Sequence, residues 1–328
     1  MELNIQTNDT QTNQPSLENY SFCLFRIPKE GGRVLWEITN SCNYSCSYCI
    51  FSANKGKVNG ELSTEEVFEV IDGLKQRDFS HLKISGGEPF IRKDMVDILK
   101  KASDLGFIVD ISTNGSLITE KRAQQLSELE LNMVHVSLDG PDAKTHEEVR
   151  GPKTYEKTIR GIQNLVTNNV YVRLGTVIHK GNEHQLEEVV KKAASLGVNE
   201  VIFSYMEPVG RMEGDNSQVS YKPIETTKSE IEILAQKYQD QVKVNYSFTE
   251  DSQSEETGTC PGGKKFLFID NLGRISPCTW VTEKDPTYQT SLTVKDASFD
   301  EVMTSNPMQN YVESCKDCKG CPARIRYE

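Results

Sequence analysis

The amino-acid sequence predicts an α/β fold, a partial TIM-like (β/α)6 barrel followed by a small C-terminal α+β module. Six short apolar runs alternate with longer segments whose apolar residues recur at helical spacing. This alternation is typical of a parallel sheet covered by helices. Six repeats are too few to close an eight-stranded barrel. We therefore expect an open barrel with a lateral mouth, wide enough for a large substrate such as a peptide.

The predicted strands and helices alternate from residue 34 to residue 203. We expect strands at 34–38, 81–84, 107–111, 133–138, 170–178 and 200–203. The first helix begins at Ser63, which forms a capping-box signature with Glu66. The following helices are expected at 94–105, 120–129, 155–167, 185–196 and 228–238, several of them ending in Gly- or Asn-containing turns. A β-hairpin is expected at 266–269 and 274–276.

Length and charge limit the classes of protein to which this chain can belong. Its 328 residues suggest about two domains, and we expect a disordered segment at 1–21, the barrel at 22–221 and the C-terminal module at 222–328. The net charge of -11 argues against non-specific nucleic-acid binding, which needs a basic face. The chain has no run of 18 apolar residues and no signal-peptide pattern. We expect a cytoplasmic protein with neither a nucleic-acid nor a membrane partner.

Eight of the nine cysteines fall in two groups, and the first group follows the first predicted strand. Cys42, Cys46 and Cys49 stand at C-x3-C-x2-C spacing. Three thiolates can hold three corners of a [4Fe–4S] cluster and leave one iron free for a ligand that is not protein. The alternative is a zinc loop that borrows a distant fourth ligand, since no further Cys or His occurs before His81. The ninth cysteine, Cys23, is isolated and is interpreted as a small apolar residue.

Together with Tyr48 before its last cysteine, this loop resembles the signature of the radical S-adenosylmethionine (SAM) enzymes. The resemblance continues at Ser85–Pro89, Ser112–Gly115 and Ser137–Gly140 and reaches roughly from Val34 to the C-terminus. It implies that SAM binds the free iron of the cluster through its amino and carboxylate groups. It also implies that one electron cleaves SAM to a 5′-deoxyadenosyl radical, which takes hydrogen from an unreactive carbon of the substrate.

The resemblance also indicates which residues contact SAM, because these motifs end neighbouring parallel strands and open on one face of a barrel. The expected cofactor-binding residues are Tyr48, Gly86, Gly87, Glu88, Ser112, Asn114, Ser137, Asp139 and Arg150. The alternative is that the Gly-containing pairs are ordinary turns. Arg150 is expected to pair with the SAM carboxylate, unless it lies on a solvated face.

The second cysteine group resembles the twitch and SPASM modules that carry auxiliary [4Fe–4S] clusters in radical SAM enzymes. Its members are Cys260, Cys278, Cys315, Cys318 and Cys321. Two fully ligated clusters would need eight cysteines, so these five favour one auxiliary [4Fe–4S] cluster with one cysteine to spare, the twitch arrangement. The expected hairpin would bring Cys260 and Cys278 together. A zinc knuckle built from the same residues is the alternative, and which of the last three cysteines is spare stays open.

The resemblance favours, as substrate, a ribosomally made precursor peptide that is crosslinked, epimerised or partly excised. An electron donor such as flavodoxin or ferredoxin is implied. About thirty residues precede the barrel, too few for a peptide-recognition domain, so a separate leader-binding protein is also expected. A small-molecule dehydrogenase or epimerase, acting for example on an aminocyclitol, and a tetrapyrrole-modifying enzyme are the alternatives. The non-enzymatic alternative is a zinc-stapled binding protein, which would contain no iron.

Overall fold

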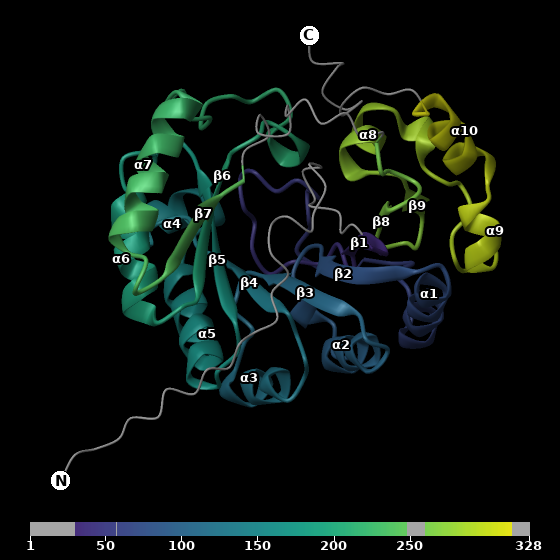
Figure 1. The fold of residues 1–328 in the computed structure, drawn as a ribbon, viewed down its shortest axis with the longest axis horizontal. Coiled ribbons are helices and arrows are strands. Elements are labelled where there is room, and N and C mark those ends of the chain that lie inside the picture. The colour runs from purple at the N-terminus through teal and green to yellow at the C-terminus, as the bar shows by residue number, and fades with distance from the viewer. Residues whose placement is uncertain (1–29, 57, 248–259, 317–328) are drawn as a thin grey trace.

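The computed structural model describes residues 30–56, 58–247 and 260–316. These residues form one nine-stranded sheet in the order β7-β6-β5-β4-β3-β2-β1-β8-β9. The strands from β7 through β8 pair in parallel, and β9 is antiparallel to β8. The two ends of the sheet lie on opposite sides of the molecule, and helices cover its outer face (Figure 1).

The strands and helices alternate as the sequence indicates. The strands are β1 Gly32–Glu37, β2 Phe79–Ser85, β3 Ile108–Thr113, β4 Met133–Ser137, β5 Val172–Ile178, β6 Glu200–Tyr205, β7 Lys243–Tyr246, β8 Phe266–Ile269 and β9 Ile275–Ser276. The helices are α1 Thr64–Gln76, α2 Met95–Asp104, α3 Glu120–Ser127, α4 Ala143–Arg150, α5 Tyr155–Thr167, α6 Leu186–Leu196, α7 Ile224–Lys237, α8 Thr279–Lys284, α9 Phe299–Met303 and α10 Asn306–Ser314. Short 3-10 helices lie at Pro89–Ile91, Gly210–Met212 and Pro286–Tyr288.

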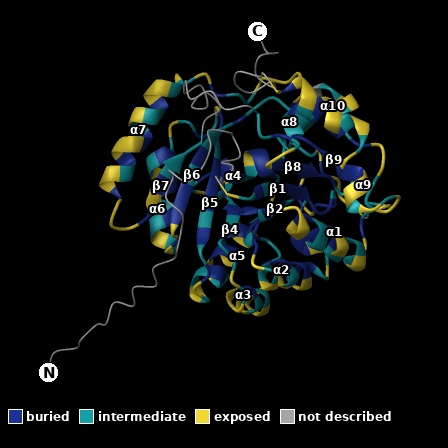
Figure 2. Ribbon diagram, turned by 45° about the vertical axis from the view of Figure 1, so that its right-hand side comes forward, coloured by how far each residue is buried: buried dark blue, intermediate teal, exposed yellow. Residues whose placement is uncertain are grey.

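The two faces of the sheet differ in chemistry. On the outer face, residues such as Val34, Leu82 and Val134 are fully buried against the helices and form the main core. Alternate residues point to the inner face, where Lys83 and His135 are only half-buried. Figure 2 shows the strands mostly in the colours of buried and intermediate residues, with exposed residues on the surrounding helices. The strands are therefore apolar outside and largely polar inside, so that the inner face of the barrel resembles a binding chamber rather than a packed core.

All six predicted barrel strands are present, and the structure extends the sheet beyond them. The capping box of Ser63 and Glu66 and the β8–β9 hairpin are also confirmed. Helix α7 and strand β7 add a seventh helix–strand unit to the parallel sheet. Both elements lie beyond residue 221, at which the sequence analysis ends the barrel. Strand β8 adds another by pairing with β1. The division of the chain into a barrel and a separate C-terminal module stays a prediction.

Helix α4 is an element that the sequence analysis did not assign. Its sequence is mostly polar, with only Val149 as a large apolar residue, so it lacks the apolar periodicity that marks the other helices. The Asp142 side chain caps its N-terminus by accepting from the backbone N–H of Thr145. The helix matters for the site because Arg150 is its last residue.

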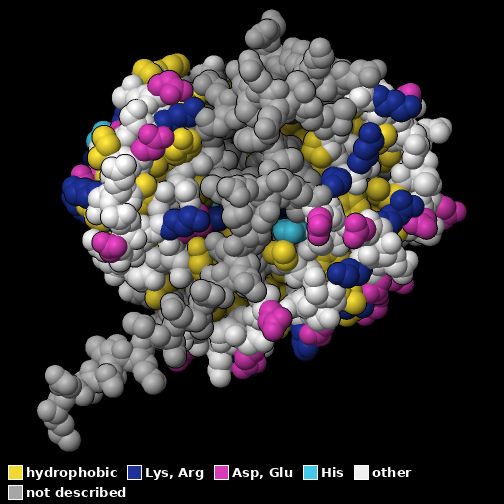
Figure 3. Space-filling view, in the orientation of Figure 1, with side chains coloured by type: hydrophobic (Ala, Val, Ile, Leu, Met, Phe, Trp, Pro, Cys, Tyr) yellow, Lys and Arg dark blue, Asp and Glu magenta, His cyan; other side chains and the backbone are white. Residues whose placement is uncertain are grey.

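Several predicted features lie outside the described residues. They are the disordered segment 1–21, the isolated Cys23, and two cysteines of the second group, Cys318 and Cys321. No helix in the described part of the chain is both long enough and apolar enough to span a membrane. On the face shown in Figure 3, acidic and basic side chains are interspersed around the rim.

Candidate active site at the carboxyl edge of the sheet

Cys42, Cys46 and Cys49 lie on a loop that leaves the carboxyl end of strand β1. Their side chains pack into one small cluster with Tyr44 and Ala53. The loop is fastened on both sides: the N–H of Cys42 donates to the carbonyl of Asn54, and the N–H of Ser47 donates to that of Val149 on α4, both at 2.8 Å. The structure therefore brings the three predicted ligands of the first cluster together.

Each of the three sulfur atoms lies near an N–H donor. The backbone N–H of Tyr44 donates to Cys42 Sγ at 3.4 Å, and that of Ala53 donates to Cys49 Sγ at 3.4 Å. A guanidinium nitrogen of Arg150 lies 3.9 Å from Cys46 Sγ. Burial raises the pKa of the Cys42 thiol to about 11, so bound metal has to displace its proton. Donors of this kind stabilise thiolate ligands and tune iron–sulfur clusters.

The clustered cysteines provide the donor set of an iron–sulfur group. Three cysteine sulfurs, as in Cys42, Cys46 and Cys49, can hold three corners of a [4Fe–4S] cluster. In residues 30–56, 58–247 and 260–316, no three His, Cys, Asp or Glu side chains converge as the ligands of one metal ion do.

Gly86 and Gly87 hold the segment after β2 against the cysteine loop. A Cβ on Gly86 would lie 2.3 Å from the carbonyl oxygen of Thr39, and one on Gly87 would lie 2.2 Å from that of Ser41. The N–H of Gly87 donates to Thr39 O at 2.7 Å. The absence of side chains therefore lets two backbones meet, and the predicted contact of these glycines with SAM stays a prediction.

Glu88 braces the carboxyl ends of β2 and β3. It is fully buried, and its carboxylate accepts from the Thr113 hydroxyl at 2.7 Å, from the Asn114 N–H at 2.7 Å and from the Phe90 N–H at 3.2 Å. Burial raises the pKa of Glu88. Its own N–H donates to Ser41 O at 2.8 Å. This carboxylate already has several protein donors, so its observed role is to position the loops.

Tyr48, Asp139 and Arg150 form a buried triangle beside Cys46. Arg150 Nε lies 2.5 Å from Asp139 Oδ2, and the Tyr48 hydroxyl bonds to both partners. The Arg150 guanidinium also lies over the Tyr48 ring, 5.3 Å from its centroid. Burial is the largest single effect and raises the pKa of Asp139, but the charges of Arg150 and His146 and the hydrogen bonds from Arg150 and Tyr48 together outweigh it and lower the pKa. Arg150 thus pairs with a protein carboxylate, and its predicted contact with the SAM carboxylate stays untested.

The remaining predicted SAM-contacting residues differ in their solvent exposure. Ser112 and Ser137 lie half-buried on the inner face, at the carboxyl ends of β3 and β4. Asn114 is buried, and its side-chain amide donates to Asn43 Oδ1 at 2.9 Å. The two serines are therefore the predicted contacts best placed to meet a ligand inside the barrel.

Arg211 is a residue of the site to which the sequence analysis assigned no contact. It follows strand β6, its backbone N–H donates to Cys49 O at 3.0 Å, and its guanidinium donates to the carbonyl oxygens of Cys46 and Ala53. A Cβ on its neighbour Gly210 would lie 2.4 Å from Ile50 O. Its position after the sixth strand could have indicated a contact with the cysteine loop, because that strand ends at the same edge of the sheet as β1.

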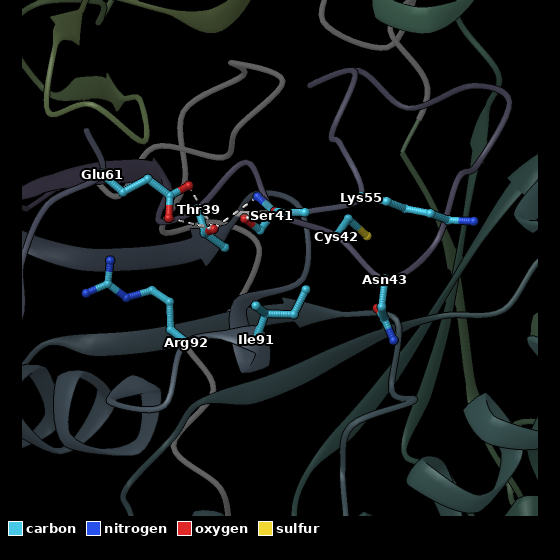
Figure 4. Close-up of a pocket in the computed structure, with 9 residues that line it drawn as sticks. Thr39, Ser41, Cys42, Asn43, Lys55, Glu61, Ile91 and Arg92 are labelled. Carbon is cyan, nitrogen blue, oxygen red and sulfur yellow. Dashed lines mark hydrogen bonds between the residues drawn. The ribbon is translucent and has the colours of Figure 1, made fainter. Parts of the chain in front are cut away.

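A cavity of about 550 Å³ opens beside Cys42. In Figure 4 Glu61 and Arg92 lie at one end of it, and Asn43 and Lys55 lie at the other. Glu61 accepts from the Thr39 hydroxyl at 2.9 Å and from the Asn40 N–H at 2.8 Å. The volume is within the range of small-ligand sites, and the buried Cys42 is one of the residues that line it.

The described cysteines of the second group also come together. Cys278 and Cys315 are buried in an apolar cluster with Tyr311, and Cys260 packs against it. The Tyr311 hydroxyl lies 3.3 Å from Cys260 Sγ, and burial raises the pKa of Tyr311 well above its ordinary value. Phe268 belongs to the same cluster, which therefore adjoins the inner face of β8.

Known proteins resemble this chain in sequence and in fold. Residues 36–193 match the family model described as "Radical SAM superfamily". The chain is 27% identical to "AdoMet-dependent heme synthase" from Nitratidesulfovibrio vulgaris, over 89% of this chain and 87% of that protein. It is 25% identical to "Mycofactocin maturase MftC" from Mycobacterium tuberculosis, over 90% of this chain and 76% of that protein.

Solved structures resemble it in fold. SuiB from Streptococcus suis, bound to S-adenosylmethionine, has a TM-score of 0.72 at 17% identity and covers 92% of this chain and 75% of its own. The same protein bound to its precursor peptide SuiA also has a TM-score of 0.72. The structure titled "Native anSMEcpe with bound AdoMet" has a TM-score of 0.66 at 19% identity, over 89% of both chains.

Proposed function

Because residues 36–193 form a radical SAM domain and the chain is an enzyme of that kind, we propose that Cys42, Cys46 and Cys49 hold its [4Fe–4S] cluster. When bound and reduced, this cluster would supply the electron that cleaves SAM to methionine and the 5′-deoxyadenosyl radical, and that radical would take hydrogen from a substrate carbon. The observation that carries the proposal is the set of three clustered sulfurs, each near an N–H donor, above a polar inner face.

The protein side chains orient the reactants and shape the site. Gly87 and Glu88 bind the segment after β2 to the cysteine loop, and Arg211 fastens the loop from the β6 side. Ser112 and Ser137 offer hydroxyl groups towards bound SAM. Within the triangle of Tyr48, Asp139 and Arg150, the guanidinium lies beside Cys46 and favours its thiolate, whereas burial and the charge of Asp139 raise the pKa of this thiol.

We propose a precursor peptide as the substrate. The described strands leave the sheet open, because β7 and β9 lie at its two ends and do not pair with each other. An open barrel admits an extended chain to the inner face. A relative named for maturation, MftC, and the fold shared with SuiB, a structure of which contains a precursor peptide, support this choice. An electron donor such as flavodoxin or ferredoxin and a separate leader-binding protein belong to the same proposal.

A tetrapyrrole is the second candidate substrate. The observation that favours it is the similarity, over 89% of this chain, to relatives named AdoMet-dependent heme synthase. Such a substrate carries several carboxylates on a flat ring, and an open, polar barrel would admit it from the same side. The two candidates therefore share the radical chemistry and differ in the molecule that enters.

The second cysteine group is proposed to hold one auxiliary [4Fe–4S] cluster. Cys260, Cys278 and Cys315 already share one apolar cluster, which would shield bound iron from water and lies next to the barrel. The fourth ligand would come from Cys318 or Cys321. In this proposal the C-terminal part is a twitch-like module that carries electrons or tunes the site.

Iron and sulfide analysis under anaerobic conditions tests both clusters. We expect about eight irons per chain in the wild type, and about four in the Cys42→Ala, Cys46→Ala, Cys49→Ala triple variant. Reductant-dependent cleavage of SAM should disappear in that variant and persist in a Cys23→Ala control. About four irons with one zinc in the wild type would make the C-terminal group a zinc knuckle. Zinc without iron would overturn the proposed function.

A further inference from the structure

The inner face of the barrel carries charged side chains in the middle of the strands. The strand register places Lys83 on β2 opposite Asp110 on β3. It places His135 on β4 between Ser112 on β3 and Arg173 on β5. The outer face of the same strands is apolar and buried. Charged groups in the centre of a sheet, facing a half-open interior, need partners.

The two carboxylates in this region are already occupied. Asp110 accepts from Arg33 at 2.8 Å and from Asn132 at 2.7 Å, one bond to each oxygen. Glu200 accepts from Arg173 at 2.7 Å and from the Asn245 amide through its other oxygen. Each arginine is thus neutralised by a carboxylate that also accepts a hydrogen bond from an asparagine.

Lys83 and His135 differ from these paired groups. Within the described residues, neither side chain makes a hydrogen bond or an ion pair with protein, and both are half-buried. Burial and the charge of Arg33 together lower the pKa of Lys83 to about 8, although the charge of Asp110 opposes them, so the ammonium remains mostly protonated at pH 7. The inner face therefore carries a cation that the charge of Asp110 attracts but that forms no direct ion pair with a described carboxylate.

Strand β5, which pairs with the strand of His135, leaves room for the imidazole ring. A Cβ on Gly175 would lie 2.1 Å from His135 Nε2, so any larger residue there would displace the imidazole. Lys83 precedes Ser85 by two residues, about 7 Å along the strand. Lys83 therefore lies one layer below the strand ends, level with Asp110, whereas His135 lies two strands away, level with Ser112.

We propose that Lys83 binds a carboxylate of the substrate inside the barrel and that His135, on β4 and level with Ser112, contributes a weaker second contact. This inference rests on the proposed function and adds the chemical class of the group that is anchored. The carboxylate can be an Asp or Glu side chain of a peptide or a propionate of a tetrapyrrole, and both would satisfy the unpaired ammonium in the same way. Anchoring below the strand ends leaves the neighbouring carbons of the substrate near the mouth, where the radical is formed.

Binding to the reconstituted holoenzyme, measured anaerobically without reductant, tests this subsite. The first probe pair is a ten-residue Ala/Ser peptide with one central Glu and the same peptide with Gln. The second pair is coproporphyrin III and its tetramethyl ester. We expect the acid of at least one pair to bind at least tenfold more tightly than its neutral counterpart. The pair that discriminates identifies the source of the carboxylate.

Variants identify the residue responsible. Lys83→Met should remove the tenfold preference for the acid, Lys83→Arg should keep most of it, and Lys100→Met, on the exposed side of α2, should leave it unchanged. His135→Asn should reduce it by a smaller factor. Melting temperatures identify any variant that misfolds. If Lys83→Met misfolds, Lys83→Arg still tests whether a positive charge at this position carries the preference for the acid.

Three outcomes would overturn the inference. They are equal binding of acid and neutral probe in both pairs, an acid preference that survives in Lys83→Met, and a loss of SAM affinity in Lys83→Met, which would assign the lysine to the cofactor. Iron content and SAM cleavage are measured separately. A failed subsite is therefore distinguishable from a failed radical SAM assignment.

Discussion

The rings of Phe51 and Phe268 stack on each other, with centroids 6.0 Å apart and planes 5° apart. Phe51 stands two residues after Cys49, and Phe268 lies on β8, in the region that follows Cys260. The loop of the first cysteine group therefore rests directly on the strand that joins the C-terminal cysteines to the barrel. This contact sets how the two cysteine groups sit relative to each other.

A double-mutant cycle should detect the coupling of these rings. We expect the free energies of unfolding of Phe51→Ala, Phe268→Ala and the double variant to give a coupling of about 0.5–1.5 kcal/mol, the usual value of an aromatic pair. Phe107 packs elsewhere, under Lys75 on α1, so the cycle of Phe107→Ala with Phe268→Ala should be additive. Additivity in the first cycle would show that the stacking contributes nothing of its own.

The Asp139–Arg150 pair should contribute strongly to stability because it is buried. Asp139→Ala leaves the guanidinium without its carboxylate, and we expect the free energy of unfolding to fall by about 3–5 kcal/mol in denaturant titrations. Asp104→Ala, which breaks the exposed pair with Lys100, is the control and should cost less than about 1 kcal/mol. Similar losses in the two variants would contradict the buried role of the pair.

Gly87→Ala should disturb the cysteine loop. The added Cβ would meet Ser41 O at 2.2 Å, and the loop has to move away, so we expect less bound iron and slower cleavage of SAM. A Cβ on Gly214 would meet no atom within 4 Å and would introduce only the strain of a φ of +77°, about 1–2 kcal/mol. Gly214→Ala should therefore keep its iron. Full iron content in Gly87→Ala would show that the close approach is dispensable.

Glu37 should make stability depend on pH. Burial raises its pKa to about 8, above the value near 4.5 of an exposed glutamate. Between these two values the folded protein keeps a proton that the unfolded chain releases, so stability falls as the pH rises. Relative to Glu37→Gln, the wild type should lose on the order of a few kcal/mol between pH 5 and pH 8. Parallel stability curves for the two proteins would contradict the raised pKa.

Local patterns were sufficient to predict most of the fold. The six barrel strands and the β8–β9 hairpin are visible in the sequence because apolar residues recur at short, regular spacings. Strand β7 and helix α4 were missed because one is short and the other is mostly polar. The parallel pairing of β8 with β1 was also missed, since pairing between distant strands leaves no mark at either one.

The candidate site likewise has features that local sequence patterns predict and features that depend on the tertiary structure. The spacing of Cys42, Cys46 and Cys49 is a local signal, and it predicted this loop as the candidate cluster site without a structure. The partner of Arg150 was not predictable, because the choice between a cofactor carboxylate and Asp139 depends on which group is nearer in space. The structure places Asp139 against the guanidinium.

The sequence by itself determined the alternation of strands and helices, the two cysteine groups and the loops that end the strands, because each is encoded within a few consecutive residues. Only the tertiary structure decided which charges neutralise each other. Arg33 and Asp110 pair across 77 residues, and Lys83, opposite Asp110 in the strand register, is left without a direct ion pair among the described residues. Such pairing follows from strand register and sheet curvature, which arise when the whole chain packs.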